Sequence, residues 1–148
     1  MHLRKMLATF VLVMMMCSVV SVPAFAAEET QIVSDLVSPA YENADTVKST
    51  LAITSSSAEC SSSCIGLSNV AQITVEQTLE KHSGWFWIWN EVDGASWTKT
   101  VNDNIIRLTN TKSGLDSGTY RLKSVFTLTN SSGKSETITI YSDEKTVG

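Results

Sequence analysis

Hydrophobic and polar residues alternate with a period of two along residues 118–130. The even positions from Tyr120 to Leu128 are apolar except Ser124, whereas the odd positions are mainly Arg, Lys and Thr. Successive side chains of an extended chain point to opposite sides, so this pattern is typical of a strand with one buried and one solvated face. A loop and a second run at 135–141 follow, which predicts an antiparallel hairpin.

The same alternation occurs at residues 70–81, where Ile73, Val75 and Leu79 share one parity against threonine and glutamate. Beyond residue 45, short β-rich runs separated by Ser, Asn and Gly clusters recur at intervals of about ten residues, and no stretch has a helical period. These features predict an all-β sandwich or barrel. The expected strands are 49–54, 58–65, 70–81, 85–92, 97–101, 105–109, 118–130 and 134–145.

Two glycine-terminated segments predict hairpin turns. Residues 81–84 and 130–133 each join two strong runs and end on a glycine that can take a positive φ. Strands that are neighbours in the sequence are therefore expected to be neighbours in a sheet. Asn130 also begins an N-x-S acceptor motif, which matters only in a cell that glycosylates such sites.

Residues 1–26 are expected to be a signal peptide. They have a positive start with Arg4 and Lys5, an apolar core at 7–20 and the small-x-small motif Ala-Phe-Ala at 24–26. Cleavage after this motif would leave a secreted, extracellular protein with no stable membrane insertion. The alternative is an uncleaved membrane anchor, because the apolar stretch is almost long enough to span a bilayer.

An acidic arm is expected at residues 27–45, ahead of a β-sandwich domain at 46–148. The arm contains five carboxylate side chains and no basic one, in a chain of 148 residues with a formal net charge of −4. Such a segment is typical of a disordered spacer, although the apolar residues at 32–37 leave docking as a short helix or an edge strand open. The negative charge and the lack of a basic stripe argue against a nucleic-acid partner.

Two cysteines, Cys60 and Cys64, remain after the signal peptide. Four residues of extended strand would separate their Cα atoms by roughly 13 Å, whereas a disulfide needs about 4.4 to 6.8 Å. We therefore expect two buried thiols that behave as small hydrophobic side chains. Pairing would require the strand to break at residues 61–63.

Asp116, Gly118 and Tyr120 stand in the order D-x-G-x-Y, which resembles a segment of immunoglobulin-type domains. The resemblance implies an immunoglobulin-like antiparallel β-sandwich of seven or eight strands, in which the tyrosine hydroxyl binds the backbone upstream at a structural corner. The family places its second disulfide cysteine two residues beyond the tyrosine, where this chain has Leu122. The resemblance therefore implies that the inter-sheet bridge is missing and that Cys60 lacks its partner.

A broader resemblance rests on G-T-Y-R-x-K-S at 118–124 and S-E-T-x-T-x-Y-S at 135–142. These motifs resemble a family of small secreted β-sandwich proteins of Gram-positive, clostridia-like bacteria, which carries no assigned activity. The resemblance implies export and a compact β domain.

As a further hypothesis, an ion pair of Asp116 with Arg107 or Lys99 would stabilise the corner formed by Asp116, Gly118 and Tyr120.

The aromatic sequence Trp-Phe-Trp-Ile-Trp at 85–89 is the strongest candidate for a binding site. In a strand, Trp85, Trp87 and Trp89 would project from one face, and Phe86 and Ile88 from the other. One alternative is an exposed platform for sugar rings, peptide or a membrane interface. The other places the tryptophan row in the core. Trp97, on the expected next strand, completes the candidate site.

Catalytic constellations are incomplete in this sequence. His82 is the one histidine beyond residue 26, and it lies in an expected turn without the partners of a catalytic triad. Paired carboxylates such as Asp143 and Glu144 are typical of solubilising surface charge, and the oxygen-rich loops at 93–94 and 102–104 lack the ligand number of a calcium site. We expect no enzyme activity, no metal and no cofactor.

The sequence therefore predicts a secreted, non-catalytic extracellular or cell-surface module, monomeric, with a possible carbohydrate, peptide or cell-surface partner at the aromatic hairpin. A structural or self-associating surface protein is the alternative, because an exposed strand edge or aromatic face can serve as an interface. A small hydrolase is the remote third possibility, since it would need His82 or carboxylates to converge in a pocket.

Overall fold

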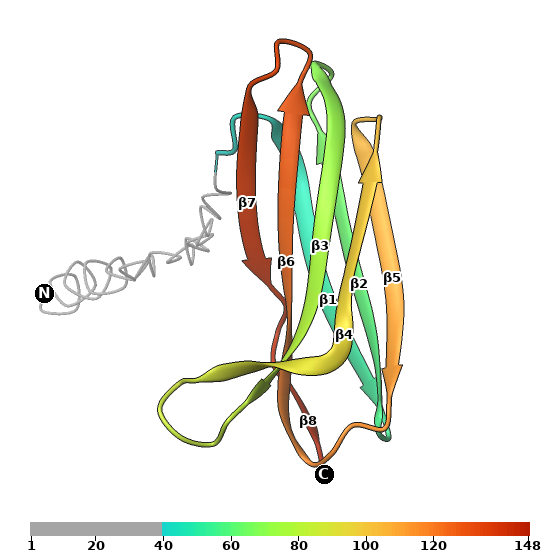
Figure 1. Ribbon diagram of the computed structural model, residues 1–148, viewed down its shortest axis with the longest axis vertical. Helices are drawn as coiled ribbons and strands as arrows, with labels where there is room; N and C mark the ends of the chain where they lie inside the picture. Colours follow the sequence, from blue (N-terminus) through green and yellow to red (C-terminus); the bar gives the residue numbers. More distant parts are fainter. Residues whose placement is uncertain (1–39) are drawn as a thin grey trace, which may run out of the picture. The chain divides into compact units, whose positions relative to one another are not determined.

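The computed structural model describes residues 40–148, which form eight β-strands and no helix (Figure 1). The expected signal peptide and most of the acidic arm lie outside these residues. The strands are β1 (Ala44–Thr54), β2 (Ser57–Gly66), β3 (Val70–His82), β4 (Trp89–Val101), β5 (Ile105–Ser113), β6 (Gly118–Asn130), β7 (Ser135–Tyr141) and β8 (Lys145–Val147). The all-β prediction and the number of strands are confirmed.

The strands form two antiparallel sheets. The three-stranded sheet has the order β1-β2-β5, and the five-stranded sheet has the order β4-β3-β6-β7, with the short β8 paired to β6 beyond the end of β7. The hairpins β1–β2, β3–β4 and β6–β7 each lie within one sheet. The glycine-terminated turns predicted this pairing for β3–β4 and β6–β7. The inner faces of the two sheets share two hydrophobic clusters, which gives a β-sandwich-like body.

The long alternating stretches are the central strands of the larger sheet. In β6 the buried side chains are Tyr120, Leu122, Ser124, Phe126 and Leu128, as the period of two predicted. In the neighbouring strand β3, every second side chain in the middle of the strand is likewise buried, and one of these is a fully buried glutamine, Gln77.

A polar layer divides the core between the two hydrophobic clusters. It consists of Ser49, Ser62, Gln77, Asn110 and Ser124, one residue each from β1, β2, β3, β5 and β6. Gln77 donates from Nε2 to Ser62 Oγ (2.8 Å) and accepts from Asn110 Nδ2 (2.8 Å), while Ser124 Oγ lies 2.7 Å from Ser62 Oγ and 2.8 Å from Ser49 Oγ. A buried polar group without a partner is costly, so this connected layer ties the two sheets to one relative register.

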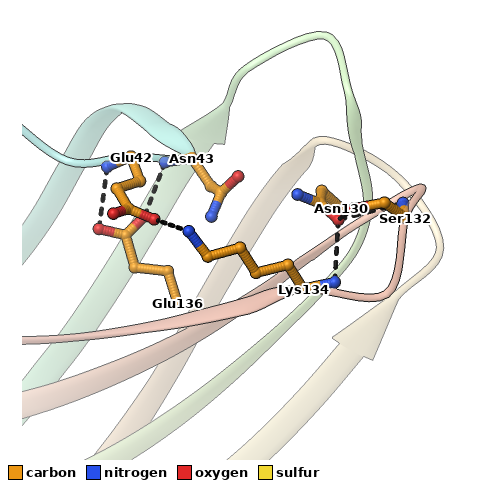
Figure 2. A network of polar contacts seen from close by, with 6 residues as sticks. All are labelled: Glu42, Asn43, Asn130, Ser132, Lys134 and Glu136. Carbon is orange, nitrogen blue, oxygen red and sulfur yellow. Dashed lines mark hydrogen bonds and ion pairs between the residues drawn. The ribbon is translucent and has the colours of Figure 1, made fainter.

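Residues at the end of the expected arm are held against β7 (Figure 2). The carboxylate of Glu136 accepts hydrogen bonds from the backbone N–H groups of Glu42 (3.0 Å) and Asn43 (2.7 Å). Lys134 Nζ lies 2.6 Å from Glu42 Oε2, and this hydrogen bond lowers the pKa of Glu42. Asn43 and Ala44 are buried, so the chain from Glu42 onward belongs to the body.

Besides the end of β5, which lies at Ser113 rather than at residue 109, three predicted strand boundaries are wrong. β1 begins at Ala44 rather than at residue 49, and the expected strand 134–145 is split at Ser142 into β7 and β8. At Ser142 a side chain takes part in the pairing with β6. The Ser142 N–H donates to Leu122 O, and the Leu122 N–H donates to Ser142 Oγ instead of to a backbone carbonyl (both 2.9 Å).

The third correction concerns the hairpin. The expected strands 85–92 and 97–101 are one strand, β4, which begins only at Trp89. A bulge accommodates Gly94, with a φ of +63°, between the pairs Glu80–Glu91 and Thr78–Ser96. Beyond this bulge the end of the β3–β4 hairpin turns away from the two sheets (Figure 1).

Among residues 40–148, no helix is long and apolar enough to cross a membrane.

Candidate functional site

The hairpin tip, residues 83–88, is a loop rather than the predicted strand. Phe86 and Trp87 have positive φ angles of 49° and 44°, and Gly84 has 77°. Two consecutive positive φ values reverse the chain in the sense that suits a β-hairpin, at a conformational cost for residues other than glycine. The predicted alternation of Trp85 and Trp87 on one face is therefore wrong, because alternation requires extended backbone.

The tip closes through its own hydrogen bonds. Ser83 N–H donates to Ile88 O (2.9 Å), and Ser83 Oγ donates to Trp85 O (2.9 Å). Gly84 N–H donates to His82 Nδ1 (3.2 Å). These contacts use the small and polar residues at the start of the loop, which leaves the following four large apolar side chains to project outward.

Those four side chains are exposed to solvent. The exposed fractions are 73% for Trp85, 74% for Phe86, 88% for Trp87 and 51% for Ile88. The interpretation that places the tryptophan row in the core is wrong for Trp85 and Trp87. The hairpin tip extends past the cover that the opposite sheet provides for the core, so no second layer formed by residues 40–148 lies over these side chains (Figure 1).

The rings of the tip do not form a flat platform. Trp85 and Phe86 contact each other edge to face, with centroids 4.9 Å apart and an interplanar angle of 71°. Edge-to-face pairing is a favourable aromatic geometry, but it presents a ridged apolar surface instead of coplanar ring faces.

The other two candidate tryptophans lie elsewhere. Trp97 is opposite Gln77 on the inner side of β4 and packs, half-buried, against the second hydrophobic cluster. Trp89 is opposite His82 at the start of β4, and the two rings contact edge to face at 5.1 Å. The structure thus brings Trp85 and Trp87 together in the tip and separates both from Trp97.

Trp89 belongs to a stacked row on the outer face of the larger sheet. The guanidinium of Arg121 lies 4.1 Å from the Trp89 ring centroid on one side and 4.1 Å from the Tyr141 centroid on the other. Arg121 Nε also lies 2.7 Å from Glu80 Oε2, with both side chains largely buried. Cation–π stacking favours such an arrangement of Arg between aromatic rings.

Sequence reasoning missed this row. The alternation at residues 118–130 predicts a solvated face for Arg121, whereas aromatic rings lie on both sides of its guanidinium. The period-two pattern places Arg121 on the outer face correctly. Its neighbours depend on strand order and register, which no local pattern contains. Tyr141 lies on β7 beside β6, whereas Trp89 lies on β4, beyond β3.

A cavity of about 310 Å³ lies at the base of the hairpin, between the β3–β4 extension and the loop before β6. Its lining includes Lys81, His82, Asn90, Glu91, Asp116 and Tyr120, so the histidine and two carboxylates share one cavity. Mixed charge, amide groups and a tyrosine ring suit a small polar ligand or a polar group of a larger one. Sequence reasoning missed this cavity because its walls come from separate parts of the chain.

Two of the three predicted corner residues, Asp116 and Tyr120, line this cavity. Tyr120 donates from its hydroxyl to Asp116 O over 2.7 Å. Gly118 has a φ of +149°, which residues with a Cβ rarely adopt, and a Cβ there would lie 2.5 Å from Cε of the flexible Lys81 side chain. The Lys81 ammonium in turn lies 5.5 Å from the Tyr120 ring centroid.

The proposed ion pair at the corner is wrong. Neither of the two ion pairs found among residues 40–148 includes Asp116. Lys99 donates instead to the backbone carbonyl of Arg107 over 2.9 Å, because the two residues face each other across the β4–β5 connection.

Cys60 and Cys64 are unpaired and buried in the single strand β2, as predicted. Burial raises the pKa of Cys60 to about 12 and that of Cys64 to about 11, with nearby Glu59 and Glu136 adding to the respective effects. Thiols that remain protonated at neutral pH are poor nucleophiles. Within residues 40–148, no group of three or more His, Cys, Asp or Glu side chains could hold a metal ion.

Comparison with known proteins gives little further information. No family model matches the chain, and no curated protein matches it. The crystal structure of wild-type OgpA from Akkermansia muciniphila is similar over 76% of this chain and 33% of that one, with 11% sequence identity and a TM-score of 0.34. The chain thus spans about a third of that structure, and the likeness adds nothing to the assignment of fold or function.

Proposed function

We propose that this protein is a secreted, non-catalytic module that binds a component of a cell surface or the extracellular space through its hairpin tip. The observation that carries the proposal is the exposure of Trp85, Phe86, Trp87 and Ile88 together. Monomeric soluble proteins rarely expose a contiguous apolar patch of several large side chains unless it serves binding. Export rests on the signal-like pattern of residues 1–26.

We also propose an immunoglobulin-like topology for the body. The order β1-β2-β5 against β4-β3-β6-β7 corresponds to strands A-B-E against C′-C-F-G of that fold. Two further features support it: Tyr120 makes its corner hydrogen bond at the start of β6, the F-like strand, and Cys60 on the B-like strand belongs to the same buried cluster as Leu122. In immunoglobulin domains these two positions hold the inter-sheet disulfide.

The environment of His82 supports a non-catalytic role. Its Nδ1 accepts a hydrogen bond from Gly84, and its ring packs against Trp89. His82 lines the cavity at the base of the hairpin together with Ser83, Glu91 and Asp116. A general base needs a nucleophile whose proton it can take, but the Ser83 hydroxyl donates to Trp85 O instead of to His82. We therefore assign His82 to the support of the tip.

The proposal is tested by binding to intact bacterial cells, isolated cell walls and glycan or peptide arrays. The double variant Trp85→Ala/Trp87→Ala is expected to lose binding by at least tenfold, because large aromatic side chains dominate the energetics of such contacts. The matched control is Ile65→Ala/Ile105→Ala, a pair of exposed apolar residues at the far end of the strands. Full binding by the tip variant would refute the proposal.

Self-association is a second candidate function. Both strands at the edges of the smaller sheet, β1 and β5, are long and offer unpaired backbone groups. A concentration-dependent increase in mass by light scattering would favour it. A monomer at high concentration, as the sequence predicts, would exclude it.

A further inference from the structure

The hairpin tip has a composition that suits an apolar environment. Its four projecting residues contain no charged group, and the polar edge of each indole is its single N–H. Tryptophan favours membrane–water interfaces because a large apolar ring and one polar handle fit the boundary between lipid tails and headgroups.

Part of the backbone of the tip is already hydrogen-bonded within the hairpin. The carbonyls of Trp85 and Ile88 accept hydrogen bonds from Ser83, and the Gly84 amide donates to His82. Backbone polar groups that lose water without a partner are costly in an apolar medium. A loop that already satisfies several of these groups internally therefore pays less to enter it.

The shape and size of the tip favour a lipid surface over a flat ligand or a protein. It projects away from the sheets (Figure 1). Its Trp85 and Phe86 rings meet edge to face at 71° and therefore do not form a flat platform for a sugar ring. Three exposed aromatic side chains amount to roughly 500 Å², below the roughly 800 Å² that each partner contributes to a stable protein interface.

The charged side chains at the base of the hairpin are two cations and three carboxylates. On the outer face, Arg121 is paired with Glu80, and on the cavity side Lys81 lies near Glu91 and Asp116. No surplus of positive charge is available to select an anionic membrane.

We propose that the hairpin tip inserts into the interface of a lipid bilayer, with Trp85, Phe86, Trp87 and Ile88 at the boundary of headgroups and acyl chains. This inference rests on the proposed function, of which it names the partner. The attachment is peripheral and reversible, is driven by apolar burial, and requires no anionic lipid.

The test uses the protein recovered from the medium of an exporting host and vesicles of phosphatidylcholine. We expect sedimentation with the vesicles that persists at high salt, and quenching of tryptophan fluorescence by brominated acyl chains. All four tryptophans lie at 85–97, so quenching reports on this hairpin and not on the N-terminal segment. Trp85→Ala/Trp87→Ala should weaken vesicle binding at least tenfold, and Ile65→Ala/Ile105→Ala less than twofold.

Each contrary result has a distinct meaning. Absence of quenching, or binding that the tip variant retains, overturns the membrane inference. If vesicles are not bound but cell walls, glycans or peptides are bound in a tip-dependent way, the inference fails and the proposed function stands. Tip-dependent dimerisation would identify a second copy of the chain, instead of a bilayer, as the partner. If Trp85→Ala/Trp87→Ala weakens no interaction with vesicles, cells, cell walls, glycans or peptides, both proposals are overturned.

Discussion

Aromatic side chains of this protein occupy two opposite environments. In β6, Tyr120 and Phe126 are fully buried between the sheets, whereas Trp85 and Trp87 at the hairpin tip are among the most exposed side chains of the described residues. Within each pair the two residues are an even number of positions apart, in a segment whose sequence predicts a strand. The difference shows that alternation buries a side chain only where extended backbone and an opposing layer are both present.

Two hairpin turns show the same contrast at the level of single residues. In the β6–β7 turn, Asn130 Oδ1 accepts hydrogen bonds from the backbone of Ser132 and Lys134 and from the Ser132 hydroxyl, so the polar side chains complete the turn (Figure 2). In the β3–β4 turn, Phe86 and Trp87 hold positive φ angles that asparagine or glycine would adopt more easily. The second turn therefore places apolar side chains outward at a cost to local stability, as is common at functional sites.

The largest expected effect on stability comes from removing a buried aromatic ring, and it is compared with removal of an exposed one. Phe126→Ala should lower the free energy of unfolding by about 3–5 kcal/mol, because it removes a fully buried ring and leaves a cavity. Phe86→Ala, the same change at the tip, should alter it by no more than about 0.5 kcal/mol. Urea denaturation of the two variants measures both values, and equal losses would contradict the assignment of Phe86 to an unsupported tip.

An intermediate effect is expected in the polar layer. Gln77→Ala should destabilise the protein by about 1–3 kcal/mol, because it leaves the buried amide of Asn110 and the hydroxyl of Ser62 short of a partner. The matched control is Gln72→Ala on the same strand, whose hydrogen bond to Asn102 is exposed and should contribute about 0.5 kcal/mol or less. An unchanged midpoint of urea unfolding for Gln77→Ala would show that the layer is not a constraint on the fold.

The smallest expected effect on stability is that of a substitution at the hairpin tip, and it is compared with the same substitution elsewhere in the β3–β4 hairpin. Trp87→Ser should change the free energy of unfolding by no more than about 0.5 kcal/mol, since the ring is almost fully solvated. Trp97→Ser should cost about 2 kcal/mol, since that ring packs against the second cluster. Thermal unfolding of the two variants compares them, and a large loss for Trp87→Ser would mean that the tip is part of the stable body.

Much of the body could be predicted from local patterns. The strands β3 and β6, their buried parity, the turn at residues 130–133 and the unpaired state of Cys60 and Cys64 all follow from the geometry of an extended chain. The candidate site could be predicted only in part. The sequence identified Trp85 and Trp87 as candidates, but two consecutive positive φ angles inside an aromatic run contradict local propensity, so the loop was not foreseen.

By itself, the sequence determined the all-β class, the alternation of the two central strands and the concentration of aromatic residues in one hairpin. Only the tertiary structure decided which of those rings are covered, which polar residues meet across the core and which partners Arg121 has. The physical reason is that a period of two defines the two faces of a strand locally, whereas the burial of each face depends on strand order, register and the reach of the opposite sheet. At the hairpin tip that opposite sheet ends, and the aromatic side chains remain available for a partner.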